Sequence, residues 1–220
     1  MFQNFDLIQL ISMIIPLLFA VTIHEAAHGY VAYKMGDNTA MLAGRLTLNP
    51  IKHLDFMGSF LLPLILKFTG SPIIFGYAKP VPVNFANLRD YRKGVIYVSS
   101  AGVLANFACA FISGMLFQFL LSLESLWYHS TAEPIISVLI LILGYSVIIN
   151  CVLAVFNLIP VPPLDGSKIF AMFLPLNLRR QYMRLERFGI VIIFLLLMTG
   201  FFNKMVSFFI NPIINFLMGK

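Results

Sequence analysis

The chain has 220 residues, of which 60% are apolar and only 11% are charged. This balance excludes an ordinary soluble protein and predicts an all-α polytopic membrane protein, organised as one membrane domain over residues 1–220. The net charge of +6 resides mainly in loops between apolar runs, so the lipid bilayer is the expected partner and nucleic acid is not.

Four apolar runs are long enough to cross a bilayer, since a spanning helix needs about 20 residues. They lie at residues 7–31, 95–122, 135–158 and 187–203. Two shorter apolar stretches, 56–75 and 205–218, are interrupted or flanked by Pro, Gly and Lys. Each of these two stretches fits a short span, a re-entrant segment or a helix at the interface.

The basic residues predict the orientation of the chain. Eight of the fifteen Lys and Arg residues fall between Lys34 and Lys93, and five more lie between Lys168 and Arg187. The loop at 124–133 has none. Because basic loops stay in the cytoplasm, the N-terminus is expected outside the cell membrane and residues 34–93 and 159–187 inside.

The first apolar run carries the sequence HEAAH near its end. His24 and His28 are four residues apart, so on a helix they lie on one face, one turn apart, and can share a zinc ion. Glu25 is rotated away, where it can reach a zinc-bound water but not the metal. Ionisable groups inside a span cost on the order of 3 kcal/mol each, which favours a metal site over three unused side chains. At about 1.5 Å per residue, His24 lies about 26 Å along the helix from Leu7, near the cytoplasmic face.

A catalytic zinc ion takes three protein ligands, so one more is expected. On the predicted cytoplasmic side, Asp37 and Asp90 lie in polar loops and are typical of turns or helix caps. The remaining candidates are His53, Asp55, Asp165 and Glu186. Asp165 has the most suggestive context, because NLIPVPPLDG (157–166) places three prolines where an apolar helix ends. A backbone broken in this way is tolerated in a membrane only beside protein or a wet cavity. A helix cap is the structural alternative for Asp165.

Three motifs together resemble the site-2 protease family of intramembrane zinc metalloproteases. They are HEAAH, GVLAN (102–106) and NLIPVPPLDG, in that order. The linking sequences GRLTLNPIKHLDFMG (44–58) and GYAKPVPVN (76–84) are similar to the short prokaryotic members without a PDZ domain. One departure is Val103, where the family commonly has Pro after the glycine.

The resemblance implies one zinc ion bound by His24, His28 and Asp165, with Glu25 as the catalytic glutamate. It also implies a three-helix catalytic core within about 7–175 and peripheral helices at about 183–218. The expected substrate is a peptide bond in or near a transmembrane segment of another membrane protein.

Hydrolysis also needs a donor for the developing oxyanion. Asn157 is the first candidate because it lies where its helix breaks, and Asn106 is the second. The alternative for both side chains is hydrogen bonding between helices within the membrane.

Two segments are expected as strands of a small cytoplasmic sheet that holds an unwound substrate. Residues 39–49 alternate loosely, and residues 78–84 have prolines at every second position, as one edge of a strand permits. A proline-rich loop is the alternative for residues 78–84.

Two other functions compete with proteolysis. A metal transporter would need polar residues along a path through the membrane, but the acids and histidines concentrate at one depth. A catalytically silent zinc-binding scaffold would gain nothing from Glu25 beside an open metal position.

Overall fold

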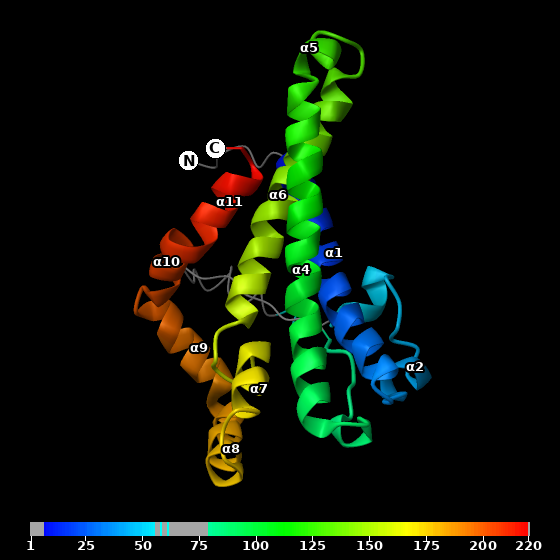
Figure 1. The fold of residues 1–220 in the computed structure, drawn as a ribbon. Helices are drawn as coiled ribbons and strands as arrows, with labels where there is room; N and C mark the ends of the chain where they lie inside the picture. Colours follow the sequence, from blue (N-terminus) through cyan, green and yellow to red (C-terminus); the bar gives the residue numbers. More distant parts are fainter. Residues whose placement is uncertain (1–6, 56–57, 59–60, 62–78, 220) are drawn as a thin grey trace.

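The computed structural model describes residues 7–55, 58, 61 and 79–219. Within these ranges, three straight helices are long and apolar enough to cross a membrane and run side by side through the centre of the molecule (Figure 1). They are α1 (Leu7–Lys34), α4 (Tyr91–Ser122) and α6 (Glu133–Asn157). The first three predicted spans are therefore confirmed to within a few residues at each end, and the chain is a multi-pass membrane protein.

Small residues bring these three helices close together, and each helix packs against the other two. Ala20 of α1, Ala110 of α4 and Ala154 of α6 are all buried. In a bilayer, helices associate through van der Waals contact and hydrogen bonds, so small side chains at the contact favour close packing. The resulting bundle provides a rigid frame for polar side chains.

Gly102 of α4 lies directly against the two histidine rings of α1. A methyl group at this position would lie 2.6 Å from His24 Cε1 and 2.6 Å from His28 Nε2. Val103 beside it is buried in mid-helix, and α4 begins much earlier, after Asp90, whose side chain accepts a hydrogen bond from Lys93 N. The valine therefore leaves the start of this helix unaffected.

Short elements connect the spans. In the described ranges between α1 and α4 these are α2 (Thr39–Leu42), η1 (Pro50–His53) and η3 (Phe85–Asn87), and between α4 and α6 there is α5 (Glu124–Trp127). The buried Asp37 carboxylate joins the end of α1 to the loop before α4. It accepts hydrogen bonds from the Asn84 backbone at 2.8 Å and the Asn87 amide at 2.9 Å. The apolar stretch 56–75 lies outside the described residues, except for 58 and 61.

The predicted small sheet is not supported, because the described residues contain no strand. Within 39–49, the first four residues form α2 and a turn follows at Gly44 (φ 63°). Residues 79–84 have no helix or strand assignment, and Ala78 lies outside the described residues. Two of their N–H groups bond to carboxylates, Val81 N to Glu25 and Asn84 N to Asp37, and Lys79 N bonds to the His53 carbonyl. Since Pro80 and Pro82 have no N–H to donate, little is left for a ladder.

After α6 the chain breaks at its prolines and continues in short helices. They are α7 (Asp165–Ala171), α8 (Leu176–Met183), η4 (Arg184–Phe188), α9 (Gly189–Met198), α10 (Phe201–Met205), η5 (Val206–Ile210) and α11 (Asn211–Leu217). The first of these packs against α4, with Val95, Ala171 and Met172 in a small apolar cluster. The start of α7 is thereby held beside α1 and α4.

The fourth predicted span, 187–203, falls on a bent pair of helical segments, Leu176–Met198 and Phe201–Leu217, which is either one broken span or a re-entrant segment. The helix stops at Met198, Gly200 adopts a left-handed conformation (φ 71°), and the two halves of the bent pair make an angle of 72°. Ten residues of α9 cover only about 15 Å, half of the apolar thickness of a bilayer. Only the bent pair as a whole is apolar and long enough for a span. Its second half packs on α4 and α6 through Met205, Ile210 and Leu217.

Candidate metal centre

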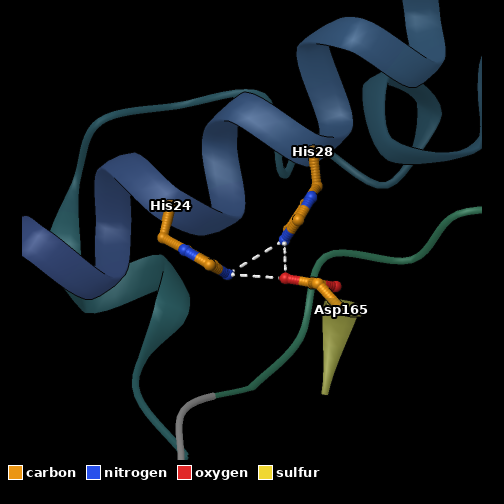
Figure 2. Close-up of side chains that lie close together, drawn as sticks. All are labelled: His24, His28 and Asp165. Carbon is orange, nitrogen blue, oxygen red and sulfur yellow. Dashed lines mark hydrogen bonds and ion pairs between the residues drawn. The ribbon is translucent and has the colours of Figure 1, made fainter. Parts of the chain in front are cut away.

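Two histidines and one aspartate converge where α1 meets the beginning of α7 (Figure 2). Asp165 Oδ2 lies 3.1 Å from His24 Nε2 and 3.0 Å from His28 Nε2, and the two Nε2 atoms are 3.0 Å apart. Only 9%, 12% and 6% of the respective side chains of His24, His28 and Asp165 are exposed. The four-residue spacing on α1 thus brings both imidazoles to a residue 141 positions away from the first.

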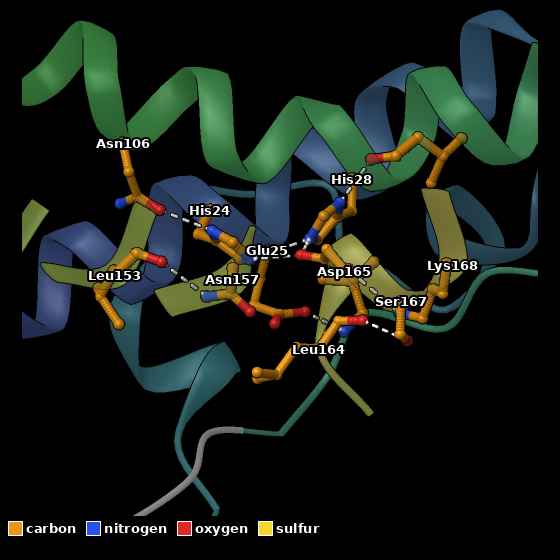
Figure 3. A network of polar contacts seen from close by, with 12 residues as sticks. His24, Glu25, His28, Asn106, Leu153, Asn157, Leu164, Asp165, Ser167 and Lys168 are labelled. Carbon is orange, nitrogen blue, oxygen red and sulfur yellow. Dashed lines mark hydrogen bonds and ion pairs between the residues drawn. The ribbon is translucent and has the colours of Figure 1, made fainter. Parts of the chain in front are cut away.

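Hydrogen bonds on the far side of each imidazole determine which nitrogen carries the proton. His28 Nδ1 donates to the Val98 carbonyl at 2.6 Å, and His24 Nδ1 donates to Asn106 Oδ1 at 2.6 Å (Figure 3). Both partners are acceptors, because the Asn106 amide nitrogen is occupied by the Ala20 carbonyl. In the neutral rings the two Nε2 atoms therefore present lone pairs to each other and to Asp165.

This donor set fits a zinc ion. Three electron-rich atoms, two imidazole nitrogens and one carboxylate oxygen, meet with no hydrogen between them, an arrangement that a cation stabilises. Tetrahedral zinc, with bonds of about 2.0–2.2 Å, needs ligand atoms about 3.3–3.5 Å apart, so a small outward movement of these side chains suffices. Two histidines and a carboxylate are a ligand set found in catalytic zinc sites.

The local sequence explains the position of Asp165. The chain turns after α6, the Ser167 hydroxyl donates to the Leu164 carbonyl at 2.6 Å, and Lys168 Nζ lies 3.2 Å from Asp165 Oδ1. Lys168 binds one carboxylate oxygen and leaves the other to face the histidines.

Glu25 lies beside His24, His28 and Asp165 in a cavity of about 260 Å³. Its Oε2 accepts a hydrogen bond from Val81 N at 2.7 Å, so the extended segment 79–84 orients this carboxylate (Figure 3). The cavity is lined by His24, His28 and Asp165 together with Glu25, Pro80, Val81, Val83, Phe85, Val98, Ser99, Asn157, Pro163 and Lys168. A base, a candidate metal position and space for a reacting group therefore share one chamber.

The two asparagines predicted as oxyanion donors occupy different places. Asn157 lines the cavity, and its amide nitrogen donates to the Leu153 carbonyl at 3.0 Å, which leaves the second hydrogen of the amide for another acceptor. Asn106 is fully buried behind His24, and its carbonyl oxygen faces that imidazole. The roles of both residues in catalysis stay predictions.

The other candidate ligands do not join the cluster found among the described residues. His53 is buried and its Nε2 bonds to the Thr47 carbonyl at 2.9 Å, while Asp55 accepts a hydrogen bond from Gly58 N at 2.8 Å. Glu186 lies exposed in η4. The geometry favours Asp165 as the third ligand.

Three contacts at the site were not predicted from the sequence. Lys168 follows Asp165 by three residues on a helix, a spacing that could have indicated their contact. The bonds of Val98 O to His28 and of Val81 N to Glu25 are made by backbone atoms of distant segments. No sequence signal points to these two.

Comparison with known proteins identifies the family. The model of peptidase family M50 matches residues 12–200, which is most of the chain. The chain belongs to peptidase family M50. This is the site-2 protease family, so the resemblance is confirmed and the protein is an intramembrane zinc metalloprotease. No solved structure matches the chain.

The similar proteins carry zinc metalloprotease names. YwhC of Bacillus subtilis (strain 168) is 37% identical over 206 residues, which is 92% of this chain and 85% of YwhC. Rip2 of Mycolicibacterium smegmatis is 29% identical over 187 residues, 85% of this chain and 66% of Rip2. Rip2 of Mycobacterium tuberculosis (strain ATCC 25618 / H37Rv) is 27% identical over 186 residues, 84% of this chain and 66% of that protein.

Proposed function

We propose that His24, His28 and Asp165 bind the zinc ion of this M50 protease, and that Glu25 acts as its general base. The substrates are peptide bonds in or near transmembrane segments of other membrane proteins. The observation that carries the proposal is the convergence of three ligand atoms within 3.1 Å of one another, in a cavity that also contains Glu25.

Bound zinc supplies a Lewis acid that polarises a peptide carbonyl and lowers the pKa of water. The Val81 N–H holds Glu25 Oε2, which leaves Oε1 to accept the proton of the attacking water and later deliver it to the leaving amine. Asn157 lies on the wall of the same cavity, and its second amide hydrogen serves as the oxyanion donor. Asn106 contributes from behind His24, by orienting the ring.

The active site opens toward the cytoplasmic side of the cell membrane, and the N-terminus lies outside. The support for this orientation is the set of basic residues at 34–93 and 159–187, against none at 124–133. His24 lies about 26 Å from Leu7 along α1, which is close to the far side of a hydrocarbon core of about 30 Å.

The described helices divide into a catalytic core and a peripheral part of one membrane domain, 1–220. The core covers about 7–175 and contains all four proposed zinc and base residues. Helices from about 183 to 218 pack on the outside of α4 and α6. Substrate residues reach the cavity beside the extended segment 79–84, which forms one of its walls.

Cleavage of a membrane-anchored test substrate by purified protein in detergent or vesicles tests the function. Wild type is compared with Glu25→Gln, and bound zinc is measured in both. We expect cleavage to fall by more than about 100-fold in the variant, since general base catalysis contributes about 10²–10⁴-fold, while zinc stays bound.

Glu124→Gln provides the matched control. Glu124 is exposed in α5 at the other end of the bundle, so this variant should cleave like wild type. Equal cleavage by wild type and Glu25→Gln would contradict the proposed base. Zinc-dependent metal uptake into vesicles without any cleavage would favour a transporter instead.

A further inference from the structure

A chain of hydrogen bonds leads away from the metal centre through the middle of the three-helix core. Asn106 on α4 accepts from His24 and donates to Asn150 Oδ1 on α6 at 2.8 Å. Asn150 in turn donates to the Ser146 carbonyl at 2.9 Å. Asn106 and Asn150 are 0% and 2% exposed, so no water competes for these bonds.

The donor and acceptor of each hydrogen bond in this series follow from the Ser146 carbonyl at its far end. A backbone carbonyl only accepts, so the Asn150 amide nitrogen must face Ser146 and its oxygen must face Asn106. Asn106 therefore presents its nitrogen to Asn150 and to the Ala20 carbonyl at 3.1 Å. Its oxygen is left for His24 Nδ1, which must carry the hydrogen.

This direction matters because a neutral imidazole has one hydrogen and two possible positions for it. With the hydrogen on Nδ1, His24 Nε2 has a free lone pair aimed at Asp165 and His28. With the hydrogen on Nε2, the same ring cannot bind a cation in the cluster. Rotation of the Asn106 amide by half a turn would exchange the two states.

We propose that Asn150 is a positioning residue that, together with the Ala20 carbonyl, holds the Asn106 amide in one orientation and thereby keeps His24 in the zinc-binding tautomer. This inference rests on the proposed role of His24 as a zinc ligand. Asn150 touches neither the ligands nor the cavity, and its effect passes through one intermediate side chain. Outer hydrogen bonds of this kind change metal affinity by about 10- to 100-fold.

The test compares zinc affinity in three variants, measured by chelator competition. Asn150→Leu removes the acceptor and should weaken zinc binding by about 10- to 100-fold. Asn150→Asp should keep zinc affinity within about threefold of wild type, because a carboxyl group buried without a cationic partner stays protonated and keeps one acceptor for Asn106 and one donor for Ser146. Ser113→Ala removes the contact between the Ser113 and Ser146 hydroxyls (2.8 Å), which does not involve Asn150 or Asn106. It should bind zinc like wild type.

Two readouts separate positioning from general damage to the fold. The absorption spectrum of Co²⁺-loaded protein should lose its tetrahedral intensity in Asn150→Leu and keep it in Asn150→Asp. In thermal unfolding of the metal-free proteins, Asn150→Leu should lose no more stability than other variants that lose one buried hydrogen bond. Zinc affinity unchanged in Asn150→Leu, or reduced equally in Ser113→Ala, would overturn the inference.

A measurement on the unmutated chain covers the case in which Asn150→Leu does not fold. Nitrogen-15 NMR of the imidazoles in metal-free protein, with His24 assigned by its absence in His24→Gln, should show the hydrogen on Nδ1. A hydrogen on Nε2 would overturn the inference. If His24→Gln binds zinc as tightly as wild type, the proposed metal site itself fails, whereas failure confined to the Asn150 variants leaves that site in place.

Discussion

Two halves of the helical assembly are held together by different forces. Between α1, α4 and α6, the buried contacts near the metal centre are directional: His24 with Asn106, His28 with the Val98 carbonyl, and Asn106 with Asn150. Between the core and the C-terminal helices they are apolar, through residues such as Met205, Ile210 and Leu217. We therefore expect hydrogen-bond geometry in the first region to set the zinc affinity, and side-chain packing in the second region to set the free energy of unfolding.

The largest expected effect in the first region is the loss of zinc binding when a proposed ligand is removed. In His28→Ala, zinc affinity should fall by more than about 100-fold, because even outer partners of a ligand contribute about 10- to 100-fold. Zinc content after dialysis against a weak chelator measures it. His53→Ala, which removes another buried histidine but one bonded to the Thr47 carbonyl, should keep its zinc. Equal zinc content in wild type and His28→Ala would contradict the assignment.

A cavity in the second region should cost stability and leave zinc in place. Ile210 is completely buried against α4 and α6, so Ile210→Ala should lower the free energy of unfolding by about 2–5 kcal/mol. Thermal unfolding in detergent measures this loss. Below the melting temperature, zinc content and cleavage should match wild type. A variant of normal stability that has lost zinc would remove the distinction between the two regions.

Two glycines of α4 allow the same substitution in both regions. A methyl group in Gly102→Ala meets both imidazole rings at 2.6 Å and should weaken zinc binding by about 10-fold. In Gly114→Ala it meets the Leu217 carbonyl oxygen at 2.8 Å, so it should cost about 1–3 kcal/mol of stability with zinc affinity unchanged. Chelator competition and thermal unfolding on both variants check the pair. Identical profiles for the two would contradict the comparison.

Asp37 lies in neither region and should show a smaller effect that depends on pH. Burial opposes its charge, but hydrogen bonds from Thr39, Asn87 and Asn84 prevail and lower the pKa of Asp37. A lowered pKa stabilises the fold fully above the ordinary carboxyl value and loses that contribution as pH falls through the lowered one. Asp37→Asn should thus cost about 1–2 kcal/mol at pH 7 and progressively less below about pH 4. Thermal unfolding of wild type and Asp37→Asn at pH 7 and below about pH 4 measures the difference in stability. A stability difference that does not change with pH would contradict this account.

The sequence predicted the metal cluster better than its surroundings. His24 and His28 share a helix, so their spacing alone brings them together, and the prolines before Asp165 mark the break that turns this carboxylate inward. The hydrogen bonds around these side chains come from residues far away in the chain: the Val98 carbonyl accepts from His28, Asn106 accepts from His24, and Val81 N donates to the neighbouring Glu25. Local patterns do not encode such contacts.

Two differences between the predicted and the observed fold have local causes. The bend at Gly200 depends on a positive φ angle inside a continuous apolar run, and hydropathy does not detect it. The alternating prolines of 78–84 fit a strand edge as well as an extended wall of a cavity. The extended wall forms because the carboxylates of Glu25 and Asp37 accept the N–H groups of Val81 and Asn84, which are then not available to a neighbouring strand.

The most direct test of the account is the number of zinc ions bound per chain in wild type, Asp165→Ala and Glu186→Ala. We predict one zinc ion in wild type and in Glu186→Ala and almost none in Asp165→Ala, because Asp165 Oδ2 lies 3.0–3.1 Å from both histidine nitrogens and Glu186 is exposed in η4. Full zinc occupancy in Asp165→Ala together with loss of zinc in Glu186→Ala would contradict the account.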